Sequence, residues 1–157
     1  VPRFGVDFKS TSFYFVMMAD LEHVSDYSMH FRQERLKSFK DWPFEDANCN
    51  AEKLADAGFY HIPSDQSPDA TRCFACYKEL DGWEPEDDPW AEHKKHSAQC
   101  PFLKFGVPVE ELSVQELLKL EIKRQNCKIN KLFDAKAKEL KEQSQAVRSE
   151  METFLQS

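Results

Sequence analysis

Apolar and polar residues follow two different patterns along this chain, and the change between them falls near Pro108. Before that residue, short apolar runs are separated by turn-forming segments such as P-S-D-Q-S-P-D at 63–69. This arrangement predicts three short strands, at 59–62, 71–74 and 78–80. Beyond Pro108 the sequence contains neither glycine nor proline, which favours one continuous helix.

Two short helices are expected ahead of the strands. The first of them is predicted over residues 30–39. Asn50 can cap the second, because its side chain accepts a hydrogen bond from a free backbone amide of the first turn. That helix should run to Ala57 and stop at Gly58, since glycine is the residue that most often ends a helix.

A third short helix is predicted to begin at Asp88 and Pro89. Aspartate accepts hydrogen bonds from the free amides of the first turn, and proline occupies that turn without losing a donor. His93 and His96 then lie three residues apart on one face of this helix.

The final segment begins with a capping box formed by Ser113 and Glu116. We therefore expect one helix over residues 113–157, about 60 Å long. Its apolar residues follow the three-four spacing of a coiled-coil seam. A helix cannot bury such a stripe against itself, so we expect it to meet a partner. The predicted partner-helix interface is Leu118, Ile122, Ile129, Phe133, Leu140, Val147, Met151 and Phe154. A homotypic coiled coil and a stripe folded back on the first part of the chain are the alternatives.

Composition indicates a soluble protein. The longest apolar stretch, at 13–19, is about a third of the ~20 residues that a membrane-spanning helix needs. The net charge of −7 argues against a general affinity for nucleic acid. Seven acidic and no basic residues lie between Glu79 and Glu92, whereas residues 119–152 hold nine basic and six acidic ones. We expect these two regions to have different partners.

The predicted domain organisation has three parts after an N-terminal leader. Residues 1–17 are rich in aromatic side chains and end at a methionine that could be a true start, so we interpret them as a non-native extension that is poorly ordered. We expect a metal-binding domain at 18–105, a linker at 106–112 and the long helix at 113–157. The sequence has no basic flank and cleavage site of a secretory signal, which indicates a cytosolic or nuclear protein.

Three cysteines and a histidine have the spacing of a metal site. Two residues separate Cys73 from Cys76, sixteen separate Cys76 from His93, and six separate His93 from Cys100. Cysteines two residues apart can direct both sulfurs at one ion, and a helix with the loop after it can supply the other two ligands. Because four protein ligands leave no position for water, the pattern predicts one structural Zn²⁺ and no metal-centred catalysis.

Spacing alone leaves the fourth ligand open, because His96 lies one turn from His93 and could take its place. A redox pair formed by the first two cysteines is the alternative to a metal site. The odd number of cysteines, five, argues against a disulfide framework. Cys49 and Cys127 are expected to be ordinary buried or partner-facing residues.

Three segments carry a family resemblance: R-L-K-S-F-K-D-W-P-F at 35–44, A-D-A-G-F-Y-H-I-P at 55–63, and C-F-A-C-Y-K-E-L-D-G-W-E-P-E-D-D-P-W-A-E-H-K-K-H-S-A-Q-C at 73–100. Together they resemble the baculovirus inhibitor-of-apoptosis repeat (BIR) family. The resemblance implies an α+β fold, in which a small zinc-stabilised domain has short helices around a three-stranded antiparallel sheet and is followed by the long helix. It also implies that the zinc ligands are Cys73, Cys76, His93 and Cys100.

One repeat followed by one long helix is similar to a branch of the family that serves as a non-enzymatic subunit of the chromosomal passenger complex. This resemblance implies borealin, the inner centromere protein and the Aurora B kinase as partners. It implies the N-terminal tail of histone three, phosphorylated on threonine, as a ligand. It further implies that the protein is found in the nucleus and the cytoplasm, and at the centromere, kinetochore, spindle midzone and midbody during division. An anti-apoptotic role is implied as well.

The acidic stretch around Trp83 suits such a ligand. An N-terminal ammonium needs carboxylates and a small pocket, which Asp81, Asp87 and Trp83 could form. A nearby phosphate needs positive donors, and Lys78 and His96 are available. The predicted peptide-binding residues are thus Lys78, Leu80, Asp81, Trp83, Asp87 and His96. The alternative is a solvated acidic face beside a core tryptophan.

The family resemblance also implies other possible activities. Direct inhibition of caspases is the alternative function, with the N-terminal peptides of IAP antagonists as further candidate ligands. A ubiquitin ligase would need the full Cys and His set of a RING, whereas one cysteine follows Cys100. Relatives form homodimers through the segment before the long helix, which here implies contacts at Tyr27, Val114 and Leu117.

Overall fold

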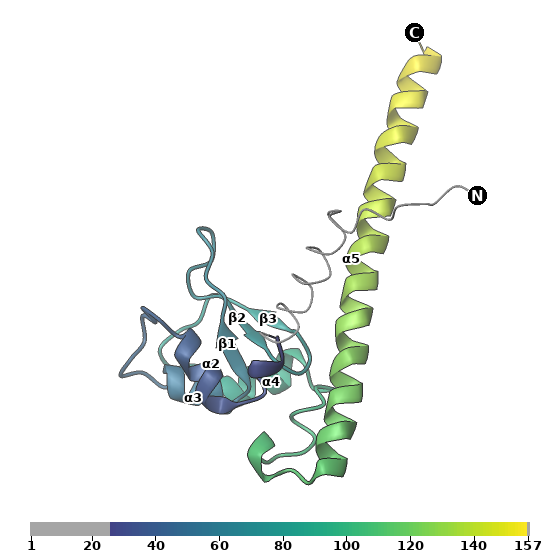
Figure 1. Ribbon diagram of the computed structural model, residues 1–157. Coiled ribbons are helices and arrows are strands. Elements are labelled where there is room, and N and C mark those ends of the chain that lie inside the picture. Colours follow the sequence, from purple (N-terminus) through teal and green to yellow (C-terminus); the bar gives the residue numbers. More distant parts are fainter. Residues whose placement is uncertain (1–25, 157) are drawn as a thin grey trace, which may run out of the picture.

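The computed structural model describes residues 26–156, so the predicted leader over 1–17 lies outside the described residues. Figure 1 shows a small domain beside one long helix that extends well past it. The elements in chain order are α2 (Arg32–Ser38), α3 (Ala51–Asp56), β1 (Phe59–His61), β2 (Thr71–Cys73), β3 (Glu79–Leu80), α4 (Pro89–His96), the 3₁₀ turn η1 (Val109–Glu111) and α5 (Val114–Gln156).

The three predicted strands form one antiparallel sheet in the order β1-β2-β3. Phe59 pairs with Cys73, and Thr71 pairs with Leu80. Each strand is one residue shorter than predicted, because Ile62, Phe74 and Lys78 belong to the connecting turns. The α+β class and the sheet are therefore confirmed.

The helix ends follow the caps that the sequence predicts. The Asn50 side chain accepts a hydrogen bond from the Lys53 amide at 3.0 Å. At the start of α4, the Asp88 carboxylate accepts from the Trp90 and Ala91 amides at 2.8 and 3.0 Å. The capping box before α5 is also formed, since the Ser113 amide donates to the Glu116 carboxylate at 2.9 Å.

Gly58 closes α3 in the left-handed backbone region, with φ of +91°. A Cβ at this position would lie 2.9 Å from the ring of Phe102. Glycine is needed here for both reasons, since the backbone is strained for other residues and the space is already filled.

Aromatic rings fill the core beneath the sheet. Phe59, Phe74 and Phe102 are almost completely buried, together with Trp42 and Leu54. The ring centroids of Phe74 and Phe102 lie 5.1 Å apart in an edge-to-face arrangement, which is a favourable geometry for aromatic pairs.

Arg35 is also buried in this core, with 2% of its surface exposed. Its guanidinium donates hydrogen bonds to the carbonyl oxygens of Ala55, Met29 and His30 at 2.7–2.9 Å. It also lies over the Phe74 ring, 4.7 Å from the centroid. Burial lowers the pKa of Arg35 to about 10, because the charged form loses its hydration.

The start of α5 packs on the small domain. Val109 from the predicted linker at 106–112 is buried in the core, and so is Leu120 from α5. Arg124 is fully buried too. The sequence did not reveal these contacts, because their partners come from far along the chain.

Arg124 lies at the centre of six polar residues, which we call the docking cluster: Asp26, His30, Tyr77, Glu121, Arg124 and Lys128. Its guanidinium bonds to Asp26 at 3.0 Å and to Glu121 at 2.9 Å. His30 reaches Glu121 at 2.9 Å, and the Tyr77 hydroxyl donates to Asp26 at 2.9 Å. Asp26, His30 and Tyr77 belong to the small domain, so the cluster joins it to α5.

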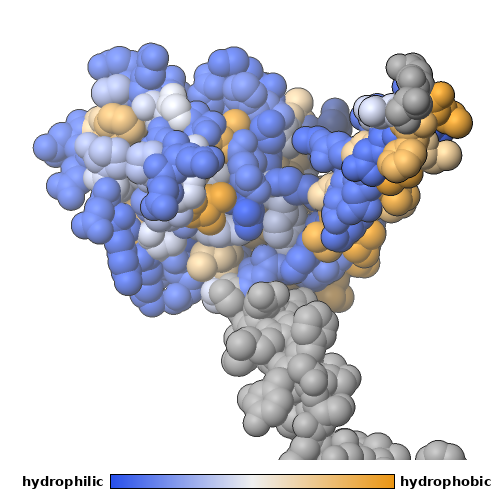
Figure 2. Space-filling model, turned by 90° about the horizontal axis from the view of Figure 1, so that it is seen from above, coloured by the Kyte–Doolittle hydropathy of each residue, from blue (hydrophilic) through white to orange (hydrophobic). Residues whose placement is uncertain are grey.

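The apolar stripe of α5 remains uncovered. Its eight predicted residues are exposed, from 55% at Val147 to 85% at Phe154. Figure 2 shows the corresponding hydrophobic side chains along α5, on the side away from the small domain. The alternative of a stripe folded back on this domain is therefore wrong. Among the described residues, none of the helices is long and apolar enough to span a membrane.

Candidate metal centre and peptide groove

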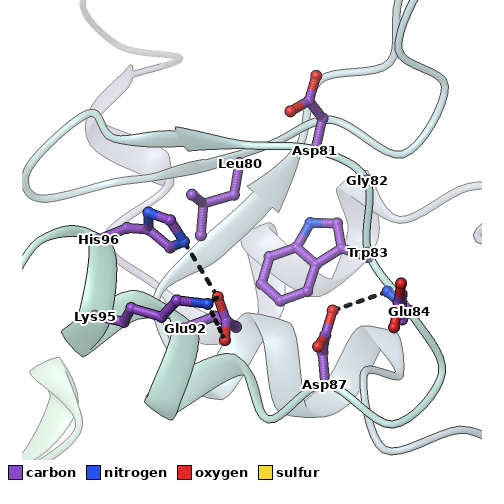
Figure 3. Close-up of a pocket in the computed structure, with 9 residues that line it drawn as sticks. All are labelled: Leu80, Asp81, Gly82, Trp83, Glu84, Asp87, Glu92, Lys95 and His96. Carbon is purple, nitrogen blue, oxygen red and sulfur yellow. Dashed lines mark hydrogen bonds and ion pairs between the residues drawn. The ribbon is translucent and has the colours of Figure 1, made fainter.

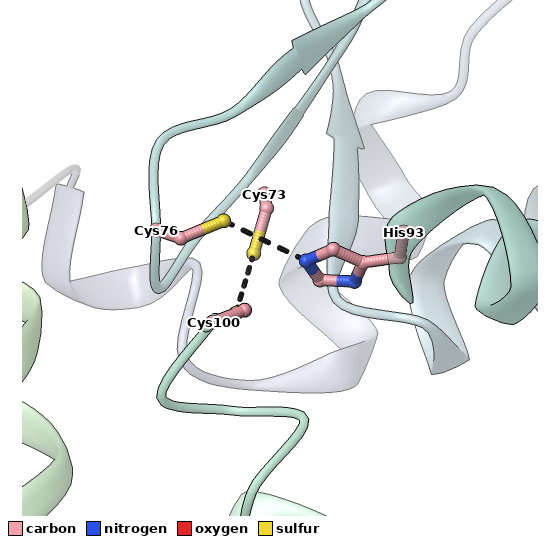
Figure 4. Close-up of side chains that lie close together, drawn as sticks. All are labelled: Cys73, Cys76, His93 and Cys100. Atoms are coloured by element: carbon pink, nitrogen blue, oxygen red, sulfur yellow. Dashed lines mark hydrogen bonds between the residues drawn. The ribbon is translucent and has the colours of Figure 1, made fainter. Parts of the chain in front are cut away.

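Four side chains from three parts of the chain meet at one point. Cys73 ends β2, Cys76 lies in the turn before β3, His93 is on α4, and Cys100 is in the loop after α4. Their ligand atoms all lie within 4.8 Å of one another (Figure 4). The turn is held by hydrogen bonds from the Tyr77 amide to the Cys73 carbonyl at 3.0 Å and from the Ala75 amide to the Cys73 sulfur at 3.3 Å.

The distances in this cluster fit a tetrahedral ion. The sulfurs of Cys73 and Cys100 lie 3.8 Å apart, and the Cys76 sulfur lies 3.6 Å from Nε2 of His93. A tetrahedron with metal–sulfur bonds of about 2.3 Å and metal–nitrogen bonds of about 2.0 Å gives separations of about 3.8 and 3.5 Å. A disulfide would need a sulfur separation of about 2.05 Å. The cluster could therefore hold one metal ion, and its three cysteines form no disulfide.

His93 is oriented for metal binding by its second ring nitrogen. Nδ1 lies 2.8 Å from the Ala57 carbonyl oxygen, which can only accept, so Nδ1 carries the proton. Nε2 then presents its lone pair to the three sulfurs. His96, the alternative ligand on spacing, is 40% exposed and pairs with Glu92 instead. The structure thus brings His93 into the cluster and leaves His96 outside.

The cysteines of the cluster differ in their affinity for protons. Burial raises the pKa of the Cys73 thiol well above its ordinary value, because a thiolate there would lack hydration. Hydrogen bonds from Cys100 and Cys73 lower the pKa of Cys76. A divalent cation would offset the cost of burying thiolates, and with four protein ligands the shell would be closed to substrate. Cys49 and Cys127 take no part in this cluster.

A cavity of about 260 Å³ lies next to the metal cluster, between the end of β3 with its following loop and α4 (Figure 3). It is lined by Leu80, Asp81, Gly82, Trp83, Glu84, Asp87, Glu92, Lys95 and His96. We call this cavity the groove. Five of the six predicted peptide-binding residues line it, but Lys78 is not among the lining residues, and Lys95 supplies a cation instead.

One end of the groove is acidic and is built around Trp83. The indole is 6% exposed and donates to the Thr71 hydroxyl at 3.2 Å, so the ring forms a fixed wall. The Asp87 carboxylate accepts from the Glu84 amide at 2.8 Å and lies beside this ring. Asp81 stands at the rim, where it accepts from the Ser67 hydroxyl at 3.0 Å and points away from the ring.

The other end carries two basic side chains of α4. His96 and Lys95 both pair with Glu92, at 3.2 and 3.0 Å. Figure 3 shows these three side chains together, across the groove from Asp87. Glu92 and Lys95 were not among the predicted residues, although the three-residue and four-residue spacings from Glu92 on one helix were a signal for both pairs. The groove therefore has carboxylates beside Trp83 at one end, and the Lys95 ammonium and the His96 imidazole beside Glu92 at the other.

The predicted homodimer residues are placed differently. Val114 is 76% exposed and Tyr27 is 43% exposed. Leu117 packs against the core of the small domain, so part of its surface is already used within the chain. The homodimer contact remains a prediction.

Comparisons with known proteins point to one family. The model of the Inhibitor of Apoptosis domain, BIR, matches residues 35–104. "Baculoviral IAP repeat-containing protein 5" of Rattus norvegicus is 46% identical over 127 residues, which are 80% of this chain and 89% of the rat protein. "Baculoviral IAP repeat-containing protein 5.2" of Xenopus tropicalis is 46% identical over 75% of this chain and 76% of its own length. A crystal structure of DIAP1 BIR1 bound to a Grim peptide is similar over 49% of this chain and 74% of that chain, with 35% identity and a TM-score of 0.42.

Proposed function

Because this chain belongs to the inhibitor-of-apoptosis family and its relatives are survivins, we propose that it is a non-enzymatic adaptor of the chromosomal passenger complex. Its groove binds the N-terminal tail of histone three phosphorylated on threonine. Its long helix binds borealin and the inner centromere protein. The complex thereby brings the Aurora B kinase to centromeres and the spindle midzone, and the protein also opposes apoptosis.

The different side chains at the two ends of the groove, carboxylates at one and basic groups at the other, carry this proposal. Asp87 and Glu84 offer carboxylates to a free N-terminal ammonium, and the Trp83 ring offers a flat wall beside them. His96 and Lys95 offer donors to a phosphate on the same peptide. A peptide with an ammonium at its start and a phosphate a few residues later matches both ends.

The ion in the metal cluster is Zn²⁺ in this proposal. Three sulfurs and one imidazole at tetrahedral separations are a common donor set for structural zinc. When bound, the ion supplies folding energy and no catalysis. The cluster then fixes α4 relative to β2 and the turn that leads to β3. The groove lies between α4 and the end of β3 with its following loop.

The uncovered stripe of α5 supports the assembly role. Eight exposed apolar residues on one helix face give a surface that helices of partner subunits can cover. The other side of the helix base is occupied by the docking cluster, so the stripe stays available while the helix is held on the domain.

The peptide proposal is tested by titrating the full chain with histone-tail peptides, phosphorylated and unphosphorylated. We expect tighter binding of the phosphorylated peptide, a loss of this preference in His96→Ala, and weak binding of both peptides in Asp87→Ala. Equal affinity of the wild-type chain for the two peptides would refute phosphate recognition. Inhibition of purified caspases at the same concentrations would favour the alternative function.

The assembly proposal is tested by replacing Ile129 and Leu140 together with Glu. We expect borealin and the inner centromere protein to be lost from the material that co-purifies from mitotic cells, with zinc content unchanged. Ala135 and Gln145 lie on the opposite face of α5 and are exposed, so a double change of these to Glu adds the same charge and serves as the control. Equal co-purification by both double variants would contradict the assigned face.

A further inference from the structure

One lysine interrupts the apolar stripe of α5. Lys136 follows Phe133 by three residues and precedes Leu140 by four, which is the spacing of neighbours on one helix face. Its side chain is 80% exposed, and Nζ lies 2.7 Å from a carboxylate oxygen of Glu139. The middle of the surface that a partner helix would cover therefore carries a positive charge.

A partner that covers Lys136 has to satisfy its ammonium. This group has three donors and no acceptor. Glu139 accepts from it at the edge of the stripe, where the glutamate side chain is itself 52% exposed. Once a partner excludes water, an apolar residue opposite Lys136 leaves the other donors without acceptors, which is costly for a buried charge. A carboxylate at that position supplies them.

The two sides of the stripe also differ in charge. A residue that directly follows a stripe residue lies about 100° further round the helix, so all such residues are on one side, which we call the basic side. Its exposed basic residues are Lys119, Lys123, Lys141 and Arg148. Two acids on the same side, Asp134 and Glu152, leave it positive on balance. On the other side, Glu139 and Glu150 directly precede stripe residues and make that side negative beyond the docking cluster.

We propose that this pattern makes α5 select an acidic helix of a different chain. Such a helix has an apolar stripe of its own, carboxylates along the edge that meets the basic side, and one carboxylate opposite Lys136. The inference rests on the assembly role proposed above, because it specifies the chemistry of the partner that this role requires. Polar residues within a helix seam and charges along its edges decide which helices pair and in which orientation.

A second copy of this chain does not meet the requirement. In a parallel pair in register, Lys136 would face the same lysine of the other copy. In an antiparallel pair, the basic sides of the two copies would face each other. Like charges in these places oppose pairing, and they discriminate against the wrong partner even where the apolar residues fit.

Self-pairing is tested by sedimentation equilibrium of the full chain as wild type, Lys136→Leu and Lys138→Leu. Lys138 is 78% exposed and lies on the opposite face of α5, so its change matches charge and size away from the stripe. We expect Lys136→Leu to self-associate about 10- to 100-fold more tightly than wild type, because an uninterrupted stripe buries one more leucine. Lys138→Leu should behave as wild type. Equal association of the two variants would refute the role of Lys136.

Two checks accompany this comparison. Any dimer through the predicted contact at Tyr27, Val114 and Leu117 is common to all three proteins, so only the additional association step is compared. That step depends on concentration and is absent at high dilution. Zinc content shows that each variant is folded.

The partner chemistry is tested with two synthetic helices that match residues 122–151 in length and share one apolar stripe, designed for parallel pairing. The acidic probe has Glu opposite Lys136 and along the edge that meets the basic side, and the basic probe has Lys at the same positions. We expect the full chain to bind the acidic probe about 10-fold more tightly, with a smaller difference at high salt. Lys136→Glu should reduce this preference, whereas Lys138→Glu should leave it unchanged. Equal binding of the two probes by wild type would overturn the proposal.

Failure of this inference can be told apart from failure of the assembly role. If the change of Ile129 and Leu140 to Glu releases borealin and the inner centromere protein but wild type binds the two probes equally, the assembly role stands and the acidic partner is wrong. If that double variant retains both subunits, the assembly role itself is refuted.

Discussion

Replacement of Arg124 by Met should release the base of α5 from the small domain. Methionine keeps most of the buried volume but removes the guanidinium, which is fully buried between Asp26 and Glu121. The two carboxylates then lose a partner that stabilises their charged forms. We expect the helix to remain helical but to separate from the domain more often.

The magnitude follows from the burial of the partners. Loss of one member of a fully buried ion pair costs about 3–5 kcal/mol, because the remaining charge is left unpaired. Here Asp26 and Glu121 keep 14% and 26% exposure, and Asp26 keeps its contact with Lys128 at 2.9 Å. Water and Lys128 can therefore replace part of the interaction with Arg124. We expect the free energy of docking to become less favourable by about 2–3 kcal/mol.

Hydrogen exchange measures this docking directly. In a helix that separates locally, the amides between Leu118 and Lys128 should exchange about 30- to 150-fold faster in Arg124→Met than in wild type. Lys136→Met is the matched control, since Lys136 pairs with Glu139 at 2.7 Å on the same helix but is 80% exposed. That pair should contribute less than about 1 kcal/mol.

The outcome that would refute this reasoning is equal protection of the α5 base in the two variants. It would mean that apolar contacts such as that of Leu120 hold the helix without help from the docking cluster. Fluorescence of the tryptophans in the small domain should change little in either variant, which separates undocking from global unfolding.

Three further outcomes are expected. Cys100→Ser should abolish zinc binding and unfold the small domain, as measured by metal content and circular dichroism; a folded, metal-free variant would contradict a structural ion. Gly58→Ala should lower the unfolding free energy by about 2–4 kcal/mol, because both the φ of +91° and the 2.9 Å approach to Phe102 oppose a Cβ; Gly106→Ala, with φ of +68° and nothing within 4 Å, should cost only about 1–2 kcal/mol. The third concerns pH. Burial raises the pKa of Asp26 and Glu121, but hydrogen bonds and nearby cations outweigh it and hold both below their ordinary values of 3.8 and 4.5. The stabilisation that the two ionised carboxylates give to docking is therefore complete above their ordinary pKa values. It is lost as the pH falls through their lower pKa values in the folded state. Burial lowers the pKa of His30 in the same cluster, so the folded state resists protonation of this ring and loses stability as the pH falls below about 6.5. After correction for the intrinsic pH dependence of exchange, the protection of the α5 amides should therefore decrease below about pH 6.5 and decrease again as the carboxylates are protonated; constant protection from pH 7 to 5 would contradict the role of His30.

Local signals in the sequence predicted most of the fold. The caps at Asn50, Asp88 and Ser113 each act within three or four residues, so the sequence contains the whole interaction. The ligands from Cys73 to Cys100 lie in one short segment whose spacing alone indicates a tetrahedral site. The structure then identifies His93 and not His96 as the fourth member of the cluster, because only His93 is buried and hydrogen-bonded to a backbone carbonyl.

Long-range polar contacts could not be predicted in this way. Asp26 and Arg124 meet across 98 residues of chain, and neither stands out in its own surroundings. A lone arginine in a basic, polar helix is typical of an exposed residue, so no pattern marked Arg124 as buried. The same limit applies to Lys78, which is near the groove in sequence but does not line it.

The docking cluster makes the long helix into a lever. α5 has 43 residues and is therefore about 65 Å long, of which the last 32 or so residues, about 48 Å, extend beyond Arg124. A tilt of about 10° at Arg124 would move the far tip by about 8 Å, more than the spacing between packed side chains. The accuracy with which a peptide in the groove is placed relative to partners on the distal stripe is thus set by a few buried charges at the pivot.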